Sequence, residues 1–299
     1  MSYPRFLMML CGACFLSSEG RAEAEPKPTD LSSVLLKAGK NTVELVQTNH
    51  HVRKVLIEMP VDVQAGERFP VVFGFDGDGG RAEGYAERLA PYVRSRRIIS
   101  VSPQGETMVG GNGRSTSFFN FIPGREWNRK QADDLGLVRQ ILALLEAKRL
   151  SDPHRIYATG SSAGGHMCNM LFKNIGIFAA IAPTKCGMVR GLHEPGQGNE
   201  RTSIFWVMGD QDKSYNGGGS AEFENIPVRE RVEIWRKFDQ CLGEPVVIFK
   251  PEMKVETYLA ADGIEVTFCT LTGITHAIPR GLAERTDAMI IDFLLRHKK

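Results

Sequence analysis

A short motif in the middle of the chain, Gly160-Ser161-Ser162-Ala163-Gly164, has the spacing of a nucleophilic serine. It follows an apolar run at 155–159 and precedes a helical run that starts near Ala163. Between a strand and a helix, a serine flanked by glycines lies in a strained turn that exposes its hydroxyl above the sheet. The N-terminus of the helix favours the negative charge that develops when this hydroxyl attacks a carbonyl. Ser162 is therefore the predicted nucleophile.

A nucleophilic serine needs a histidine as base and a carboxylate that orients the histidine. Of the seven histidines, His276 is the one in a loop between a late predicted strand and the last predicted helix. The chain order Ser, Asp or Glu, His places the base there. Asp212, in the loop after the predicted strand 203–208, is the predicted acid. Asp210 in the same loop is the alternative, because it could instead stabilise the turn.

Two backbone N–H groups should complete the site by binding the oxyanion. Ala163 follows the nucleophile and supplies one, and Asp78 is predicted to supply the other through its backbone. Asp78 lies in the turn 76–80, after the predicted strand 70–75. Asp76 and Asp78 could also suggest a metal loop, but the following sequence lacks the spaced oxygen ligands of a calcium loop. No metal and no cofactor are predicted.

Strand-like and helical segments alternate along most of the chain. The predicted strands are 42–47, 52–58, 70–75, 97–101, 155–159, 178–183, 203–208, 245–249 and 264–270. The predicted helices are one that ends near 94, one at 131–148, one that starts near 163, and two at 228–240 and 283–296. Residues 104–129 are predicted as a long loop with an aromatic group, Phe118, Phe119, Phe121 and Trp127. This alternation predicts an α/β fold with a mostly parallel central sheet and helices on both faces. Ligands bind such sheets at the carboxyl ends of the strands, where the loops of Ser162, Asp212 and His276 should meet.

The N-terminus is typical of an export signal. Arg5 is followed by a mostly apolar run at 6–16 and by a small-residue cleavage site at Ala22-Glu23-Ala24. The apolar run is shorter than the roughly 20 residues that span a bilayer, so no membrane anchor is predicted. The expected organisation is a signal peptide at 1–24, a flexible leader at 25–41 and a single catalytic domain at 42–299. The predicted location is secreted or periplasmic.

Composition and cysteine usage limit the remaining possibilities. The 299 residues are 42% hydrophobic, which suits one large domain, and the net charge is +2 with no basic block that would bind nucleic acid. Four cysteines follow the predicted cleavage site, Cys168, Cys186, Cys241 and Cys269. An even number of cysteines in an oxidising compartment suggests disulfides, and the sequence leaves three pairings open.

Several segments together resemble the secreted α/β-hydrolases grouped with polyhydroxybutyrate depolymerases, feruloyl esterases and acetylxylan esterases. The likeness is carried by the nucleophile segment 156–165, by the acid loop 209–212 with 215–218, and by Trp235 with Cys241 and Cys269 before the histidine loop 273–276. Asp76 stands where this family usually has a histidine.

The resemblance implies the α/β-hydrolase fold and a serine ester hydrolase that works through an acyl-enzyme. Its substrates would be soluble aryl, acetyl or hydroxyalkanoate esters, small or oligomeric, from plant polysaccharide or polyester. The resemblance also implies a Cys241–Cys269 disulfide. Cys168 and Cys186 would form a second pair, or Cys168 would be a buried free thiol.

Two other functions are compatible with these residues. A peptidase on the same fold would use the same triad, because the triad also cleaves amides. A binding protein that kept the fold without turnover is the second possibility, and Asp76 beside the expected oxyanion site is the feature that favours it.

Overall fold

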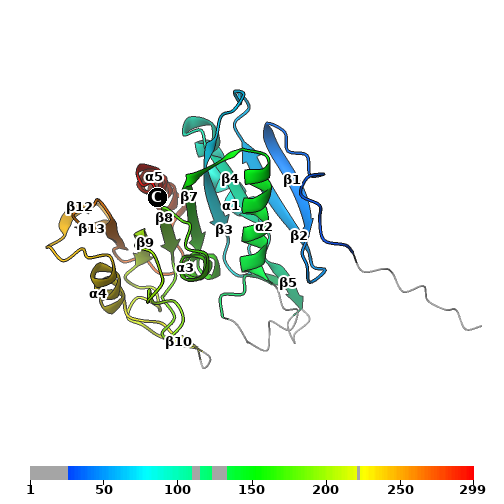
Figure 1. The fold of residues 1–299 in the computed structure, drawn as a ribbon. Coiled ribbons are helices and arrows are strands. Elements are labelled where there is room, and N and C mark those ends of the chain that lie inside the picture. Colours follow the sequence, from blue (N-terminus) through cyan, green and yellow to red (C-terminus); the bar gives the residue numbers. More distant parts are fainter. Residues whose placement is uncertain (1–25, 110–114, 123–132, 221–222) are drawn as a thin grey trace, which may run out of the picture.

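The computed structural model describes residues 26–109, 115–122, 133–220 and 223–299 (Figure 1). The predicted signal peptide at 1–24 and Trp127 lie outside these residues. The helices are α1 (Ala82–Ser95), α2 (Asp134–Ala147), α3 (Ala163–Ile175), α4 (Val228–Phe238) and α5 (Arg280–Arg296). The strands are β1 (Gly39–Val46), β2 (Val52–Met59), β3 (Phe69–Phe75), β4 (Ile99–Pro103), β5 (Glu106–Val109), β6 (Ser115–Phe118), β7 (Ser151–Ser161), β8 (Ala180–Thr184), β9 (Ser203–Gly209), β10 (Gly219–Ser220), β11 (Phe223–Glu224), β12 (Val246–Lys250), β13 (Met253–Leu259) and β14 (Glu265–Leu271).

The main sheet has ten strands in the order β1-β2-β4-β3-β7-β8-β9-β14-β13-β12. Its middle, from β4 to β14, is parallel throughout. Antiparallel pairs extend it at both edges, β1 and β2 on one side and β13 and β12 on the other. The predicted class, a mostly parallel sheet with helices on both faces, is confirmed.

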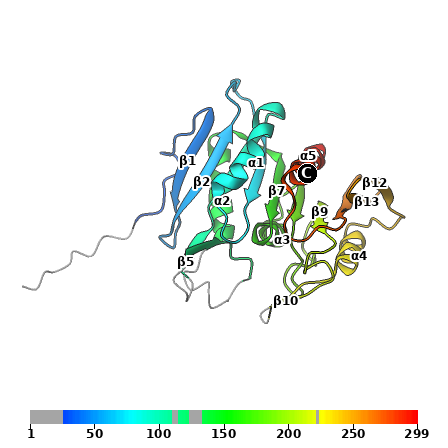
Figure 2. The same cartoon turned by 180° about the vertical axis from the view of Figure 1, so that it is seen from behind.

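Two apolar clusters cover the two faces of this sheet. Successive residues of β3 point to opposite faces, so Val71 and Phe73 belong to one cluster and Val72 to the other. Helices α2, α3 and α4 cover the first face, and α1 and α5 cover the second. Helix α2 is therefore in front of the sheet in Figure 1, and α1 is in front in the reverse view of Figure 2. Both faces of the central strands are dry, which explains their continuous apolar sequences.

The structure differs from the sequence prediction at several places. Strand β1 begins at Gly39, and Thr29 in the predicted leader already exchanges two hydrogen bonds with the backbone of Val46. The predicted loop 104–129 contains the antiparallel pair β5 and β6. Strand β13 was not predicted, because its mixed polar and apolar residues form an antiparallel strand that is only partly covered. Within the described part of the chain, no helix is long and apolar enough to cross a membrane.

Candidate active site

The predicted nucleophile lies in the sharp turn between β7 and α3. Ser162 has a φ of 57° and a ψ of −118°, a left-handed conformation that is strained for a residue with a side chain. The turn is possible because the flanking glycines allow the backbones to approach closely. A Cβ added to Gly160 would lie 2.2 Å from the Gly164 carbonyl oxygen. A Cβ added to Gly164 would lie 2.1 Å from the Phe75 carbonyl oxygen. The Ser162 N–H donates to Thr184 O at 2.9 Å, which fixes the turn to β8.

Three side chains from distant parts of the chain meet at this turn. His276 Nε2 lies 3.1 Å from Ser162 Oγ, and His276 Nδ1 lies 2.6 Å from Asp212 Oδ2. Because a carboxylate can only accept, Nδ1 carries the proton and donates it to Asp212. Nε2 is then the acceptor for the Ser162 hydroxyl. This is the order of contacts that a serine nucleophile, its base and its orienting acid require.

The environment of Asp212 keeps it ionised. Its side chain is 2% exposed, whereas that of His276 is 52% exposed. Burial alone would raise the pKa of Asp212. The hydrogen bonds from His276 and from the Ser214 N–H outweigh burial and hold the pKa below its ordinary value. A buried negative charge beside the imidazole stabilises the imidazolium that forms when His276 accepts a proton.

The loop of the acid and the loop of the histidine are attached to each other. Gly209 packs so closely that an added Cβ would lie 2.0 Å from the Ile274 carbonyl oxygen, and the Gln211 N–H donates to the same oxygen at 3.0 Å. Asp210 Oδ1 accepts from the Gly273 N–H at 2.8 Å. Of the two acids that the sequence offered, Asp212 therefore contacts the imidazole, and Asp210 holds the backbone of the histidine loop.

The two predicted oxyanion donors lie on either side of Ser162. Ala163 is the first residue of α3, so its N–H has no acceptor within the helix. On the other side, Gly77 is in contact with the serine, because an added Cβ there would lie 3.2 Å from Ser162 Cβ. Asp78 follows Gly77 and lines the same cavity as Ser162 and Ala163. Both backbone segments therefore border the space that a tetrahedral oxyanion would occupy.

Asp76 is turned away from that space. Its Oδ1 accepts from the Gly77 N–H at 2.8 Å, and its carboxyl group lies against Gly80 and Gly84, near the start of α1. A helix N-terminus is a favourable place for a carboxylate. The charge therefore does not point at the developing oxyanion, and the feature that favoured a binding protein loses its force.

The cavity above the three side chains has a volume of about 830 Å³. One part of its wall is aromatic, because Phe121 stacks on His166 with ring centres 4.5 Å apart and Phe223 meets His166 edge-on. Behind this wall, His193 accepts from the Val189 N–H and donates to the Phe121 carbonyl oxygen. Burial lowers the pKa of His193 to about 4, so it is neutral and serves as a fixed support for Phe121.

Several residues of this cavity were not found from the sequence. Lys185, at the end of β8, lines it together with Phe223 and Asn225. A lysine in a left-handed conformation has no signal in the sequence, and the short strands near Phe223 follow no long apolar run. Of the predicted aromatic group, Phe118 and Phe119 are buried as packing residues and Phe121 reaches the cavity.

The predicted Cys241–Cys269 disulfide is absent. All four cysteines of the described chain are free and buried. Cys241 belongs to the apolar cluster on the α4 face of the sheet, and Cys269 of β14 belongs to the cluster on the α5 face. The sheet itself separates the two thiols. Cys168 and Cys186 are not bonded either, and burial raises the pKa of both thiols, to about 12 for Cys186.

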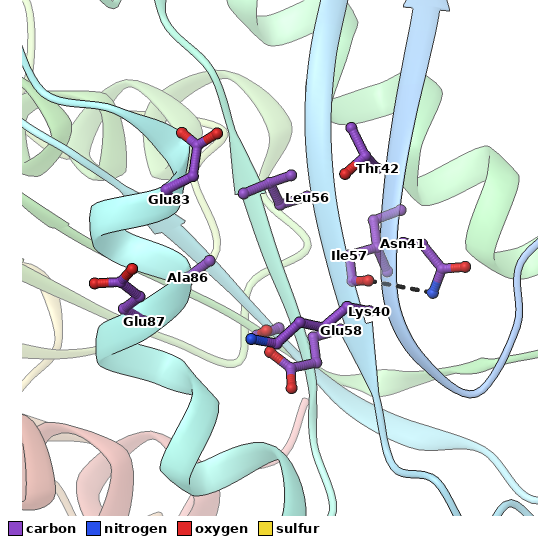
Figure 3. Close-up of a pocket in the computed structure, with 10 residues that line it drawn as sticks. Lys40, Asn41, Thr42, Leu56, Ile57, Glu58, Glu83, Ala86 and Glu87 are labelled. Atoms are coloured by element: carbon purple, nitrogen blue, oxygen red, sulfur yellow. Dashed lines mark hydrogen bonds between the residues drawn. The ribbon is translucent and has the colours of Figure 1, made fainter.

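A second, smaller cavity lies between α1 and the first strands (Figure 3). Its volume is about 170 Å³, and Figure 3 shows Lys40 and Glu58 among the residues that line it and Asn41 bonded to the Ile57 carbonyl oxygen. No histidine or cysteine lines it. It therefore lacks the arrangement of a serine beside a histidine that the cavity of Ser162 contains. In the described ranges, no group of three His, Cys, Asp or Glu side chains is arranged to hold a metal ion.

The parallel sheet, the strained serine between β7 and α3, and the histidine loop after the last parallel strand define an α/β-hydrolase fold. No family model matches the chain. The chain is 26% identical to feruloyl esterase B of Piromyces equi over 243 residues, which are 75% of this chain and 42% of that protein. It thus spans less than half the length of this relative. The resemblance to feruloyl esterases that the sequence predicted is confirmed by this homology.

Solved structures agree on the fold. An acetyl xylan esterase from Aspergillus awamori superposes with a TM-score of 0.59 at 14% identity, over 86% of this chain and 100% of that chain. A ferulic acid esterase superposes with a TM-score of 0.57 at 14% identity, over 88% and 99% of the two chains. A thermostable esterase gives a TM-score of 0.56 at 17% identity, over 87% and 63%. At these identities the likeness shows the fold alone.

Proposed function

We propose that this protein is a carboxylic-ester hydrolase with a Ser162–His276–Asp212 catalytic triad. The observation that carries the proposal is the continuous chain of contacts from Asp212 Oδ2 through the imidazole to Ser162 Oγ, at 2.6 Å and 3.1 Å. The homology to a feruloyl esterase supports ester hydrolysis as the reaction.

In the proposed mechanism, Ser162 Oγ attacks the ester carbonyl while His276 Nε2 takes the hydroxyl proton. Asp212 keeps the imidazole in the required tautomer and stabilises its positive form. The N–H groups of Ala163 and Asp78 bind the oxyanion. His276 then gives the proton to the leaving alcohol, and an acyl-enzyme remains on Ser162. Water, deprotonated by the same histidine, attacks the acyl-enzyme and releases the acid.

The proposed substrates are soluble aryl or acetyl esters, including those released from plant polysaccharides. A cavity of about 830 Å³ has the size of those that hold drug-sized ligands. The wall of Phe121, His166 and Phe223 offers flat surfaces on which an aromatic acyl group can pack. Hydroxyalkanoate oligomers remain candidates because the cavity is open to solvent on the His276 side.

The experiment is a substrate panel measured with the wild-type protein and the Ser162→Ala variant. We expect hydrolysis of methyl ferulate, acetylated xylan or hydroxybutyrate oligomers, with loss of turnover in Ser162→Ala. Ferulamide and peptide anilides in the same panel test the peptidase alternative. Cleavage of the amides without the esters, or turnover that survives Ser162→Ala, would contradict the proposal. The absence of turnover with binding of the same compounds would favour a binding protein.

We further propose that the protein is exported, with mature protein beginning at Glu25. This rests on the sequence features of residues 1–24. Intact mass of protein from the secreted or periplasmic fraction tests it, and a full-length chain that stays in the cytoplasm would refute it.

A further inference from the structure

Lys185 is held in an unusual backbone conformation beside the nucleophile. Its φ is 51°, in the left-handed region that favours glycine. The preceding residue, Thr184, accepts the Ser162 N–H through its carbonyl oxygen, and the Lys185 N–H donates to Val207 O at 2.9 Å. Lys185 is thus fixed at the point where β8 meets the catalytic turn.

The residues that follow are fixed equally firmly. The Cys186 carbonyl oxygen accepts from the buried Arg231 at 2.6 Å, and the Gly187 carbonyl oxygen accepts from Asn169 at 3.3 Å. A segment with this many buried hydrogen bonds has little freedom to relax. A strained residue in such a rigid segment persists only because the surroundings impose it, and strain of this kind is concentrated at functional sites.

The Lys185 side chain is half-buried and lines the cavity that contains Ser162 and His276. Within the described chain, its ammonium group has no hydrogen bond or ion pair to another residue. Burial lowers its pKa and the charge of Arg88 adds to this effect, while the charges of three carboxylates, Asp76, Asp212 and Asp287, act in the opposite direction. An ammonium group that has lost part of its water and has no carboxylate in direct contact is an unusual feature for a pocket wall, because such groups are normally paired.

The three carboxylates whose charge acts on Lys185 each form hydrogen bonds with other groups. Asp287 forms a two-pronged ion pair with Arg88, at 3.1 Å and 2.5 Å. Asp212 is bonded to His276, and Asp76 accepts from its own turn. The missing partner of Lys185 is therefore best supplied by the substrate.

We propose that Lys185 is a specificity residue that binds a carboxylate on the substrate, so that the enzyme prefers esters whose acyl or alcohol part carries a negative charge. The inference rests on the proposed esterase function and names a substrate class within it. Uronic-acid esters and half-esters of dicarboxylic acids have the required chemistry.

The test compares matched esters that differ only in charge. Mono-4-nitrophenyl glutarate and 4-nitrophenyl pentanoate place the charge on the acyl side. 4-Acetoxyphenylacetate and its neutral amide, 4-acetoxyphenylacetamide, place it on the alcohol side. We expect wild-type kcat/KM to favour the charged member of at least one pair. Lys185→Met should reduce that preference by about tenfold, a value between those of exposed and buried charge pairs. Lys185→Arg should retain most of it.

Two controls separate this role from simpler ones. Lys213→Met removes the same charge from an exposed lysine of the same cavity and should change the preference less, because water screens an exposed charge. Lys185→Gly suits the left-handed backbone, so it should fold and still lose the preference. Equal slowing of charged and neutral esters in Lys185→Met would overturn the inference, because Lys185 would then only balance the charges of Asp76 and Asp212. A preference that survives Lys185→Met would overturn it as well.

Failure of the esterase proposal can be recognised separately. Wild-type protein that hydrolyses none of the four esters would contradict the esterase function. Charge selectivity is then measured as binding of monoethyl glutarate to the Ser162→Ala variant by calorimetry. Binding that disappears in the Ser162→Ala, Lys185→Met double variant supports the carboxylate site without turnover, and binding that is unchanged overturns it.

Discussion

Replacing Asp212 with asparagine should disable the site through the tautomer of His276. Asp212 accepts two hydrogen bonds, from the Ser214 N–H at 2.9 Å on Oδ1 and from His276 Nδ1 at 2.6 Å on Oδ2. An asparagine has one oxygen for these two donors. If that oxygen remains with Ser214, the amide NH₂ faces Nδ1 and forces the proton onto Nε2. Nε2 can then no longer accept the Ser162 proton.

The expected loss is about 10⁴-fold in kcat, equivalent to about 5.5 kcal/mol of activation free energy. The matched control is Asp210→Asn. Both bonds to the Asp210 side chain, from Gly273 N–H and from Gln211, use Oδ1, so an asparagine can keep them. Asp210→Asn should therefore change kcat by no more than about threefold, which is about 0.65 kcal/mol of activation free energy.

The assay is steady-state hydrolysis of 4-nitrophenyl acetate by wild type and both variants, at equal foldedness by circular dichroism. A mild Asp212→Asn together with a severe Asp210→Asn would show that the wrong carboxylate has been assigned to the imidazole. Two mild variants would show that no carboxylate of this loop orients the base.

Three further outcomes follow from packing and burial. Gly164→Ala should destabilise the protein by about 1–3 kcal/mol in urea unfolding and abolish turnover, because its Cβ would lie 2.1 Å from the Phe75 carbonyl oxygen; normal stability would contradict this. Burial, partly offset by a backbone N–H, raises the pKa of Asp239 from 3.8 to about 7. Between pH 4 and 7 the folded protein then holds a proton that the unfolded chain lacks. As the pH rises through this window, the free energy of unfolding of the wild type should therefore fall relative to that of Asp239→Asn, by on the order of 4 kcal/mol. The same difference in unfolding free energy between the two proteins at pH 5 and at pH 8 would refute it. Because Cys241 and Cys269 are free, dithiothreitol should leave Tm unchanged, and a linked peptide in non-reducing mapping would contradict the structure.

Sequence was sufficient where a local pattern determines the backbone. The continuous apolar run of β3 and the glycines around Ser162 each have one physical explanation, namely a strand covered on both faces and a turn with no room for side chains. The meeting of Ser162, Asp212 and His276 followed from the way parallel strands deliver their ends to one edge of a sheet, together with the chain order Ser, Asp or Glu, His.

Sequence was insufficient where the outcome depends on which face of a strand a residue occupies. Cys269 lies on the α5 side of β14, whereas the adjacent Phe268 lies on the α4 side. A shift of one position decides whether a disulfide to Cys241 is possible, and a resemblance does not fix that position. The left-handed Lys185 was missed for a different reason. Its conformation is imposed by hydrogen bonds that join β9, α3 and α4 to the segment 185–187. These contacts come from other elements, so the local sequence around Lys185 carries no turn signal.

The central claim is that Ser162 is a nucleophile activated by His276. The most direct measurement is labelling with a fluorophosphonate, followed by intact mass and peptide mapping, because a serine without a base reacts slowly with phosphorus. We predict a single adduct on Ser162 in the wild-type protein and none in Ser162→Ala or His276→Ala. An adduct on another residue, or labelling that persists in His276→Ala at the wild-type rate, would contradict the claim.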